Sequence, residues 1–211
     1  VVLVRIAERS TSLSKRALDI GADGIIVPWM EKVEEVEEAV RDCRYPPEGR
    51  RGIGGERATI WGQCLNEHAN EANENVLVIP LIENINAIPN VANMCKVDGI
   101  DIFFFGPADF SASAGFRGQW EGPGVAEQIL ELKDIINAAG KHCGVMSTSV
   151  QNLTERRDQG FRMLALGPDS GLLMRSMHQS LQAVDCDRLP ATSLDPTDGK
   201  PVSKSDTKIK K

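Results

Sequence analysis

The 211-residue sequence has no apolar run near the roughly 20 residues that a membrane-spanning helix needs, so we expect no membrane segment. It also lacks an excess of basic residues, because 24 Lys and Arg stand against 30 Asp and Glu. Nucleic acid and anionic membranes bind to basic patches, so we expect neither as a partner. The opening VVLVRIAE has no basic segment and no small-residue cleavage site, so we expect no signal peptide and predict a cytoplasmic location.

Paired cysteines are absent as well. The cysteines are odd in number, widely spread and without a C-x-x-C pair, at positions Cys43, Cys64, Cys95, Cys143 and Cys186. This spacing argues against a disulfide framework and against a thiolate metal site. We therefore expect reduced thiols, with Cys95 and Cys143 in the core.

The remaining composition, 41% hydrophobic and 26% charged, is that of a globular domain large enough to bury a core. Short β-branched runs alternate with helical stretches. The pattern predicts strands at 1–6, 24–29, 75–82, 99–105, 142–147 and 161–167, and helices at 11–20, 31–43, up to 95, 125–139, 150–159 and 170–184.

Six βα units in series, with strands that are apolar on both faces, indicate an α/β fold in which helices cover a parallel sheet. A TIM-type (β/α)8 barrel and a doubly wound sheet both have this pattern. No G-x-G-x-x-G follows the first strand, which weakens a dinucleotide-binding interpretation.

Two segments fall outside the repeating pattern. Residues 45–75 have no clear period, which favours a functional loop, an interface loop or a broken helix. From residue 186 the composition changes to Pro, Ser, Thr, Asp and Lys. We therefore predict a barrel domain over 1–185 and a disordered tail over 186–211.

Charged side chains follow several strands at their carboxyl ends, where parallel barrels build their active sites. Arg5 ends the first strand, Glu83 the third, and Asp109 follows the fourth. Each has an ordinary explanation alone: Glu83 as a helix N-terminal charge, Asp109 as a turn cap and Arg5 as a solvated side chain. Together they fit a hard divalent cation held by two carboxylates, beside an arginine suited to an oxyanion.

Other catalytic arrangements are poorly supported. His68 lies in the polar segment, His142 begins a strand at its amino end, and His178 lies in the last helix. We expect all three to be structural or exposed. No Ser-His-Asp order stands out, and no Lys falls within a strand to form a Schiff base.

Several segments together resemble the HpcH/HpaI aldolase family over residues 1–184. They are VVLVR, DIGADGIIVPWMEKVEEVEEAV, RYPPEGRRGIG, RATIW, the strand ending in IE, FFGPADFSASAG and LGPDSGLL. The family consists of metal-dependent, pyruvate-forming class II aldolases of the phosphoenolpyruvate/pyruvate barrel superfamily. The resemblance implies a lyase that cleaves or forms 4-hydroxy-2-oxo acids through a pyruvate enolate.

The resemblance also implies roles for individual residues. Glu83 and Asp109 would bind Mg²⁺ or Mn²⁺, with Co²⁺ as a further option. Arg5 would be the catalytic residue that contacts the keto oxygen of pyruvate, oxaloacetate or a hydroxy-oxo acid, and the backbone at Ala108 and Asp109 would hold the substrate carboxylate. Family members are commonly hexamers, so we expect a homo-oligomer.

Two features depart from the family pattern. The chain begins at what would be the third strand of the family's barrel, so no residue matches the acidic/His motif that supplies the general base. Leu81 stands where many of these aldolases have Gln. Two alternatives are therefore kept: a catalytically impaired paralogue or truncated product with an intact metal and oxo-acid pocket, and a lyase resembling oxaloacetate decarboxylase or macrophomate synthase.

Overall fold

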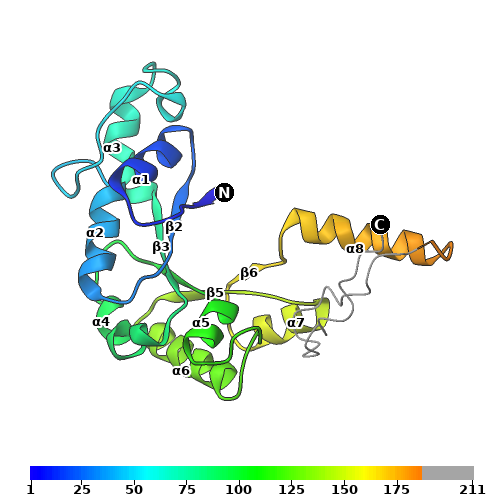
Figure 1. The fold of residues 1–211 in the computed structure, drawn as a ribbon. Helices are drawn as coiled ribbons and strands as arrows, with labels where there is room; N and C mark the ends of the chain where they lie inside the picture. Colours follow the sequence, from blue (N-terminus) through cyan, green and yellow to red (C-terminus); the bar gives the residue numbers. More distant parts are fainter. Residues whose placement is uncertain (187–211) are drawn as a thin grey trace.

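A computed structural model describes residues 1–186 and shows one curled sheet of parallel strands in chain order (Figure 1). The strands are β1 (Leu3–Arg5), β2 (Gly24–Val27), β3 (Leu77–Ile82), β4 (Ile102–Phe105), β5 (His142–Met146) and β6 (Met163–Ala165). Each strand pairs with the next along the chain. The fold is therefore a partial TIM-type barrel, one of the two folds that the pattern allows.

Helices α1 to α7 lie in the connections between successive strands, and α8 follows the last strand. They are α1 (Thr11–Asp19), α2 (Val33–Cys43), α3 (Leu65–Asn75), α4 (Val91–Met94), α5 (Pro107–Ser113), α6 (Val125–Ala138), α7 (Val150–Asp158) and α8 (Asp169–Gln182). Two 3₁₀ turns, η1 (Arg57–Thr59) and η2 (Ile85–Asn90), complete the connections. Side-chain caps fix several starts, since Ser10 accepts from the Leu13 N–H before α1 and Ser149 from the Asn152 N–H before α7.

The two faces of the sheet carry different cores. The outer face packs on the helices in a large cluster that includes Ile25, Val78, Phe103 and Phe105. The inner face carries a smaller cluster whose buried members are Ile79, Leu81 and Phe104. All six strands contribute partly buried neighbours to it. Because side chains alternate along a strand, residues with the parity of Leu81 face the inside of the curl.

Three connections differ from the prediction. The segment at 45–75, expected to be a loop or a broken helix, contains α3, whose bounds the pattern does not give because Ala72 is its single buried residue. The expected helix ending near residue 95 is mostly η2, since Pro89 lies inside it and has no N–H to donate. The segment after the fourth strand, where the pattern predicts no helix before residue 125, begins with the short helix α5, which has Pro107 in its first turn.

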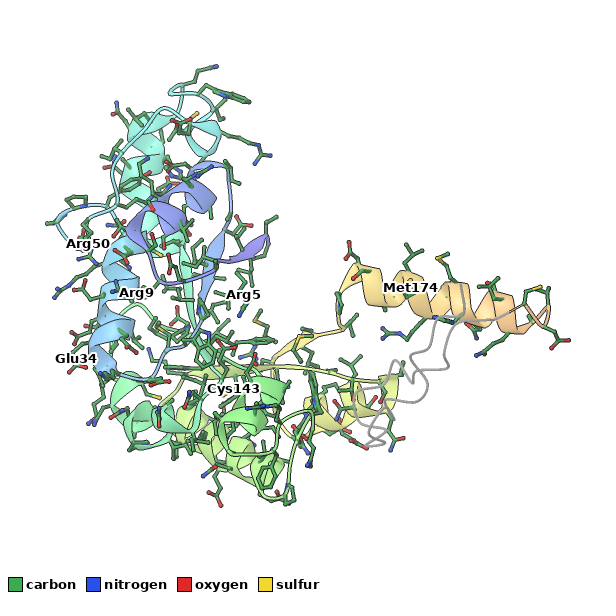
Figure 2. All side chains as sticks on the ribbon, viewed as in Figure 1. Arg5, Arg9, Glu34, Arg50, Cys143 and Met174 are labelled. Carbon is green, nitrogen blue, oxygen red and sulfur yellow. The ribbon has the colours of Figure 1, made fainter. Side chains whose placement is uncertain are left out.

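The last helix projects away from the sheet (Figure 1), and none of the 14 residues of α8 is buried. Figure 2 shows Met174 on this helix, apart from Arg5 and Cys143 on the sheet. Its exposed apolar side chains are Leu172, Leu173, Met174 and Met177. Over residues 1–186, no helix is long and apolar enough to cross a membrane. The predicted tail covers residues 186–211, and its part beyond Cys186 is outside the described residues.

Candidate metal and oxo-acid site

Glu83 follows β3 directly and shares the inward parity of Ile79 and Leu81. Its side chain is 2% exposed, although it carries an ionisable carboxyl. The Trp29 backbone N–H donates to its Oε1 at 3.0 Å. The Arg5 Nη2 atom lies 3.9 Å from Oε2, which is too long for a hydrogen bond. A buried carboxylate therefore keeps acceptor positions free.

Arg5 ends β1 on the same inner face, two residues beyond Leu3. Its side chain is 54% exposed, so the guanidinium reaches Glu83 while remaining accessible from solvent. A guanidinium presents several N–H donors in a fixed plane, which suits a carboxylate or a 2-oxo oxygen. The structure thus brings together two of the residues that the sequence selects, Arg5 and Glu83.

Asp109 lies in the first turn of α5, directly beyond the end of β4, and its side chain is exposed. Its negative charge interacts electrostatically with the Glu83 carboxylate, so the two carboxylates lie close enough to affect each other. Gly106 lies between them in the chain, and a Cβ built there would come 3.2 Å from Glu83 Oε2. The missing side chain leaves room beside the buried carboxylate.

The electrostatics of Glu83 are dominated by burial. Burial raises the pKa of the Glu83 carboxyl above its usual range, and the neighbouring charge of Asp109 raises it further. The Trp29 N–H and the Arg5 guanidinium oppose these effects and lower the pKa. On balance the pKa is raised. The positive charge near Glu83 is therefore too small to offset the cost of burying its ionised carboxylate.

The donor set fits a hard divalent cation. A cation beside Glu83 Oε2 would supply the charge that the buried carboxylate lacks. Among residues 1–186, no group of three or more His, Cys, Asp or Glu side chains could hold a metal ion. Mg²⁺ is commonly bound by one or two carboxylates, while water and substrate oxygens occupy its remaining coordination positions.

Other polar residues at strand ends have structural roles. Ser149 caps α7, and the Asp169 carboxylate accepts from the Ser170 N–H at the start of α8. His68 packs edge-on against Tyr45, with ring centroids 6.0 Å apart, and His142 lies 3.0 Å from an Arg162 nitrogen. All five cysteines fall within the described residues and are free thiols, with Cys95 and Cys143 buried as predicted.

The sequence carries no signal for one participant in the site, Trp29. Its backbone N–H contacts Glu83, and its φ of 57° lies in the left-handed region, which costs a bulky residue roughly 1–2 kcal/mol. Backbone donors exist at every non-proline residue, so no residue type signals this contact. Strained backbone of this kind is concentrated at functional sites.

The chain is similar to known proteins of one family. The HpcH/HpaI aldolase/citrate lyase family model matches residues 1–176. The chain is 39% identical over 173 residues to 4-hydroxy-2-oxovalerate aldolase of Rhodococcus jostii, covering 82% of the chain and 66% of that relative. It is 36% identical to hydroxypyruvate/pyruvate aldolase of Roseobacter denitrificans, covering 82% and 68%. The chain thus spans about two thirds of the length of these relatives.

A solved structure shows the same arrangement of the backbone. It belongs to an HpcH/HpaI aldolase/citrate lyase family protein from Burkholderia cenocepacia, with a TM-score of 0.83 and 31% sequence identity. The match covers 87% of this chain and 73% of the other. The six-stranded curl therefore corresponds to part of a longer fold in that protein.

Proposed function

Because the chain belongs to the HpcH/HpaI aldolase/citrate lyase family, we propose that it is a metal-dependent carbon–carbon lyase acting on small 2-oxo acids. The reaction is the cleavage or formation of 4-hydroxy-2-oxo acids through the enolate of pyruvate. The observation that supports it most directly is the buried Glu83 carboxylate, 2% exposed and short of positive charge, at the inner mouth of the sheet.

Glu83 and Asp109 are the proposed ligands of Mg²⁺ or Mn²⁺. When bound, the ion supplies the Lewis-acid charge that draws electrons toward the 2-oxo group of the substrate. Glu83 is held for this role from one side by the Trp29 N–H, which fixes Oε1 and leaves Oε2 toward the open mouth. The inner cluster beneath it, with Leu81 4% exposed, keeps water away from the lower side of the carboxylate.

Arg5 is the proposed catalytic residue. Its guanidinium stands at the rim beside Glu83 and would donate to the 2-oxo oxygen, where negative charge grows as the enolate forms. The N–H groups of Ala108 and Asp109 lie in the first turn of α5, so they have no acceptor within that helix. We propose that they hold the substrate carboxylate.

Oxaloacetate decarboxylation with added Mn²⁺ tests this proposal without requiring a general base. The bond to the departing carboxylate breaks, its electron pair forms the enolate, CO₂ leaves, and water supplies the proton that yields pyruvate. We expect metal-dependent pyruvate release, measured by a coupled dehydrogenase assay. Exchange of the pyruvate methyl protons with solvent, followed by NMR, reports on enolate formation from the other direction.

Variants identify the ligands. Glu83→Gln and Asp109→Asn should each lower Mn²⁺ affinity by roughly 100-fold or more, measured by calorimetry, since even groups outside the metal's direct ligands cost 10- to 100-fold. Glu34→Gln removes an exposed carboxylate on α2 and should leave the affinity unchanged. Unchanged binding in both site variants would refute the metal site. Intact binding with neither reaction would favour the impaired-paralogue alternative over the lyase.

We also propose that the protein acts as a homo-oligomer in the cytoplasm. The support for self-association is the exposed apolar surface of α8 and the family resemblance, in which hexamers are common. Exposed Leu and Met side chains on a helix that buries none of its residues are typical of surfaces that bind another protein chain.

A further inference from the structure

A hollow of about 590 Å³ lies at the opposite end of the sheet from the proposed metal site. Its walls come from the end of α1, from η1 and from α3, and Figure 1 shows α1 and α3 at one end of the molecule. Ala22 and Asp23 precede β2, and Asn75 and Val76 precede β3, so the hollow is at the amino ends of these strands. Glu83 follows the carboxyl end of β3, so the hollow is separate from the metal site.

Arg51 lines this hollow and is 2% exposed, which is rare for a charged side chain. Its Nη2 donates to Asp19 Oδ1 at 3.0 Å, and its guanidinium carbon lies 4.5 Å from the centre of the Tyr45 ring. Lys15 pairs with Oδ2 of the same aspartate, so the three charged side chains carry one net positive charge. Within residues 1–186, the buried Arg51 Nε has no hydrogen-bond partner. The wall of the hollow therefore has an unused donor and an excess of positive charge.

His68, on α3, lines the same hollow, and its buried Nε2 also has no hydrogen-bond partner in the described part of the chain. Its ring packs edge-on against Tyr45, the ring that the Arg51 guanidinium covers. Burial lowers the pKa of His68 and the charge of Arg51 lowers it further, while Asp19 and Glu71 oppose this. The protonated imidazole therefore lacks sufficient negative charge around it.

Arg57 provides a second guanidinium at the rim of the hollow, and its side chain is exposed. Its Nη1 donates to the Ile20 carbonyl at 2.7 Å, which holds it beside the hollow. A guanidinium has five N–H donors, so most of them remain available to a ligand. Asp23 and Glu71 also line the hollow, but both are exposed. Solvent screens their charges more than it screens the buried charge of Arg51.

We propose that this hollow binds a phosphate group, which accepts hydrogen bonds from Arg51, His68 and Arg57. Guanidinium donors match phosphate oxygens, and hydrogen bonds between charged groups are roughly twice as strong as neutral ones. Inorganic phosphate and a phosphate monoester of a small molecule share this chemistry. The volume of the hollow is in the range of pockets that hold larger ligands, and the exposed indole of Trp61 lines it, which favours a monoester.

The first test measures binding of inorganic phosphate and of phenyl phosphate to the full chain by isothermal titration calorimetry at neutral pH. We expect both to bind at a single shared site, with phenyl phosphate the tighter ligand because its ring can lie against Trp61. Tighter binding of phenyl phosphate supports a monoester, and equal affinities support the free anion. Absence of binding by both compounds at millimolar concentrations overturns the inference. The test is independent of the proposed function, because no proposed metal ligand lines the hollow.

Two variants remove donors without disturbing the fold. His68→Phe removes Nε2 and keeps an aromatic ring against Tyr45, and Arg57→Ala removes an exposed side chain. Each should weaken phenyl phosphate binding at least tenfold, because hydrogen bonds to charged groups contribute more than neutral ones. Arg51→Ala is less suitable, since it would leave the carboxylate of Asp19 without its buried partner. Wild-type affinity in both His68→Phe and Arg57→Ala overturns the inference.

Matched controls remove similar side chains elsewhere. His142→Phe changes a half-buried histidine at the start of β5, and Arg157→Ala removes a guanidinium that is 66% exposed on α7. Both should bind phenyl phosphate like the wild type. Arg5→Ala tests whether the phosphate binds instead at the proposed oxo-acid site. Loss of binding in Arg5→Ala with normal binding in His68→Phe would also overturn the inference.

Nuclear magnetic resonance locates the bound anion directly. The chain has three histidines, and the imidazole signals missing in His68→Phe belong to His68. Phenyl phosphate should shift these signals selectively. At saturation the pKa of His68 should rise, because a neighbouring anion favours the charged imidazole. Shifts confined to His142 or His178 would contradict the assignment of the hollow.

Discussion

Arg5 reaches Glu83 across an intervening strand: Nη2 lies 3.9 Å from Oε2, although β2 separates β1 from β3. Adjacent strands lie about 4.8 Å apart, so the backbones of β1 and β3 are roughly twice that distance from each other. The long arginine side chain closes this gap from the rim. The pair forms because both residues end inward-facing rows, not because their strands are neighbours.

Gly106→Ala tests the space beside Glu83. Its φ of −105° is open to any residue, so the backbone tolerates the change. The new Cβ would lie 3.0 Å from Glu83 Cβ and 3.2 Å from Oε2, which forces the carboxylate to move. We expect Mn²⁺ affinity, measured by calorimetry, to fall roughly tenfold while far-UV circular dichroism stays unchanged.

A second glycine provides the comparison for this variant. A Cβ at Gly55 would meet its nearest atom at 3.7 Å, which is ordinary van der Waals contact. Gly55→Ala should therefore bind Mn²⁺ like the wild type. Equal affinity in both variants would show that the space beside Gly106 is not needed by the cation.

Arg5→Ala separates substrate binding from metal binding. Removing the guanidinium should weaken binding of oxalate, an unreactive mimic of the enolate, by at least tenfold in the presence of Mn²⁺. This follows because hydrogen bonds to charged groups contribute roughly 1.5–3 kcal/mol. Mn²⁺ binding alone should persist. Both quantities are measured by isothermal titration calorimetry.

Arg41 is a suitable control, because its side chain is 57% exposed and also pairs with a glutamate, Glu38, at 3.2 Å. Arg41→Ala should leave oxalate binding as it is in the wild type. If Arg5→Ala also binds oxalate normally, Arg5 has no role in holding the oxo acid.

The sequence predicts much of this fold for identifiable reasons. Strands such as β3 are continuous apolar runs, and turn residues such as Gly21 mark the ends of helices. The missed elements have weak patterns: α3 buries only Ala72, and α5 is short and rich in small residues. The same holds for the site. Position at a strand end identifies Arg5 and Glu83 from the sequence, whereas the contact of Trp29 with Glu83 is made by its main chain and has no sequence signal.

Cys143 gives a prediction for alkaline pH. Burial raises the pKa of its thiol from an ordinary 9.0 to about 12. The unfolded chain therefore loses this proton first, so the stabilising contribution is complete below pH 9 and is lost as pH rises toward 12. Urea unfolding should show the wild type losing roughly 2 kcal/mol relative to Cys143→Ala between about pH 8.5 and pH 10.5. A difference that is constant with pH would contradict the raised pKa.

Helix α8 gives a prediction for assembly. Leu173 and Met177 are 62% and 50% exposed on a helix that buries none of its residues. Leu173→Glu and Met177→Glu should each weaken self-association at least tenfold, since burying one such side chain contributes about 1.5–3 kcal/mol. Sedimentation velocity over a range of concentrations measures this. Val150→Glu, at a residue 82% exposed on α7, should not change the association, and equal behaviour of all three variants would exclude α8 as the contact.

The alternation of faces along β3 has a consequence for how this chain can change during evolution. Leu81 and Glu83 point inward while Ile82 packs against the helices, so position within the strand decides whether a residue contributes chemistry or core. Deleting one residue in β3 would turn the Glu83 carboxylate into the helix-facing layer and present an aliphatic side chain at the mouth. Insertions and deletions are therefore tolerable only in the loops, and the strand lengths are fixed by the site as much as by the sheet.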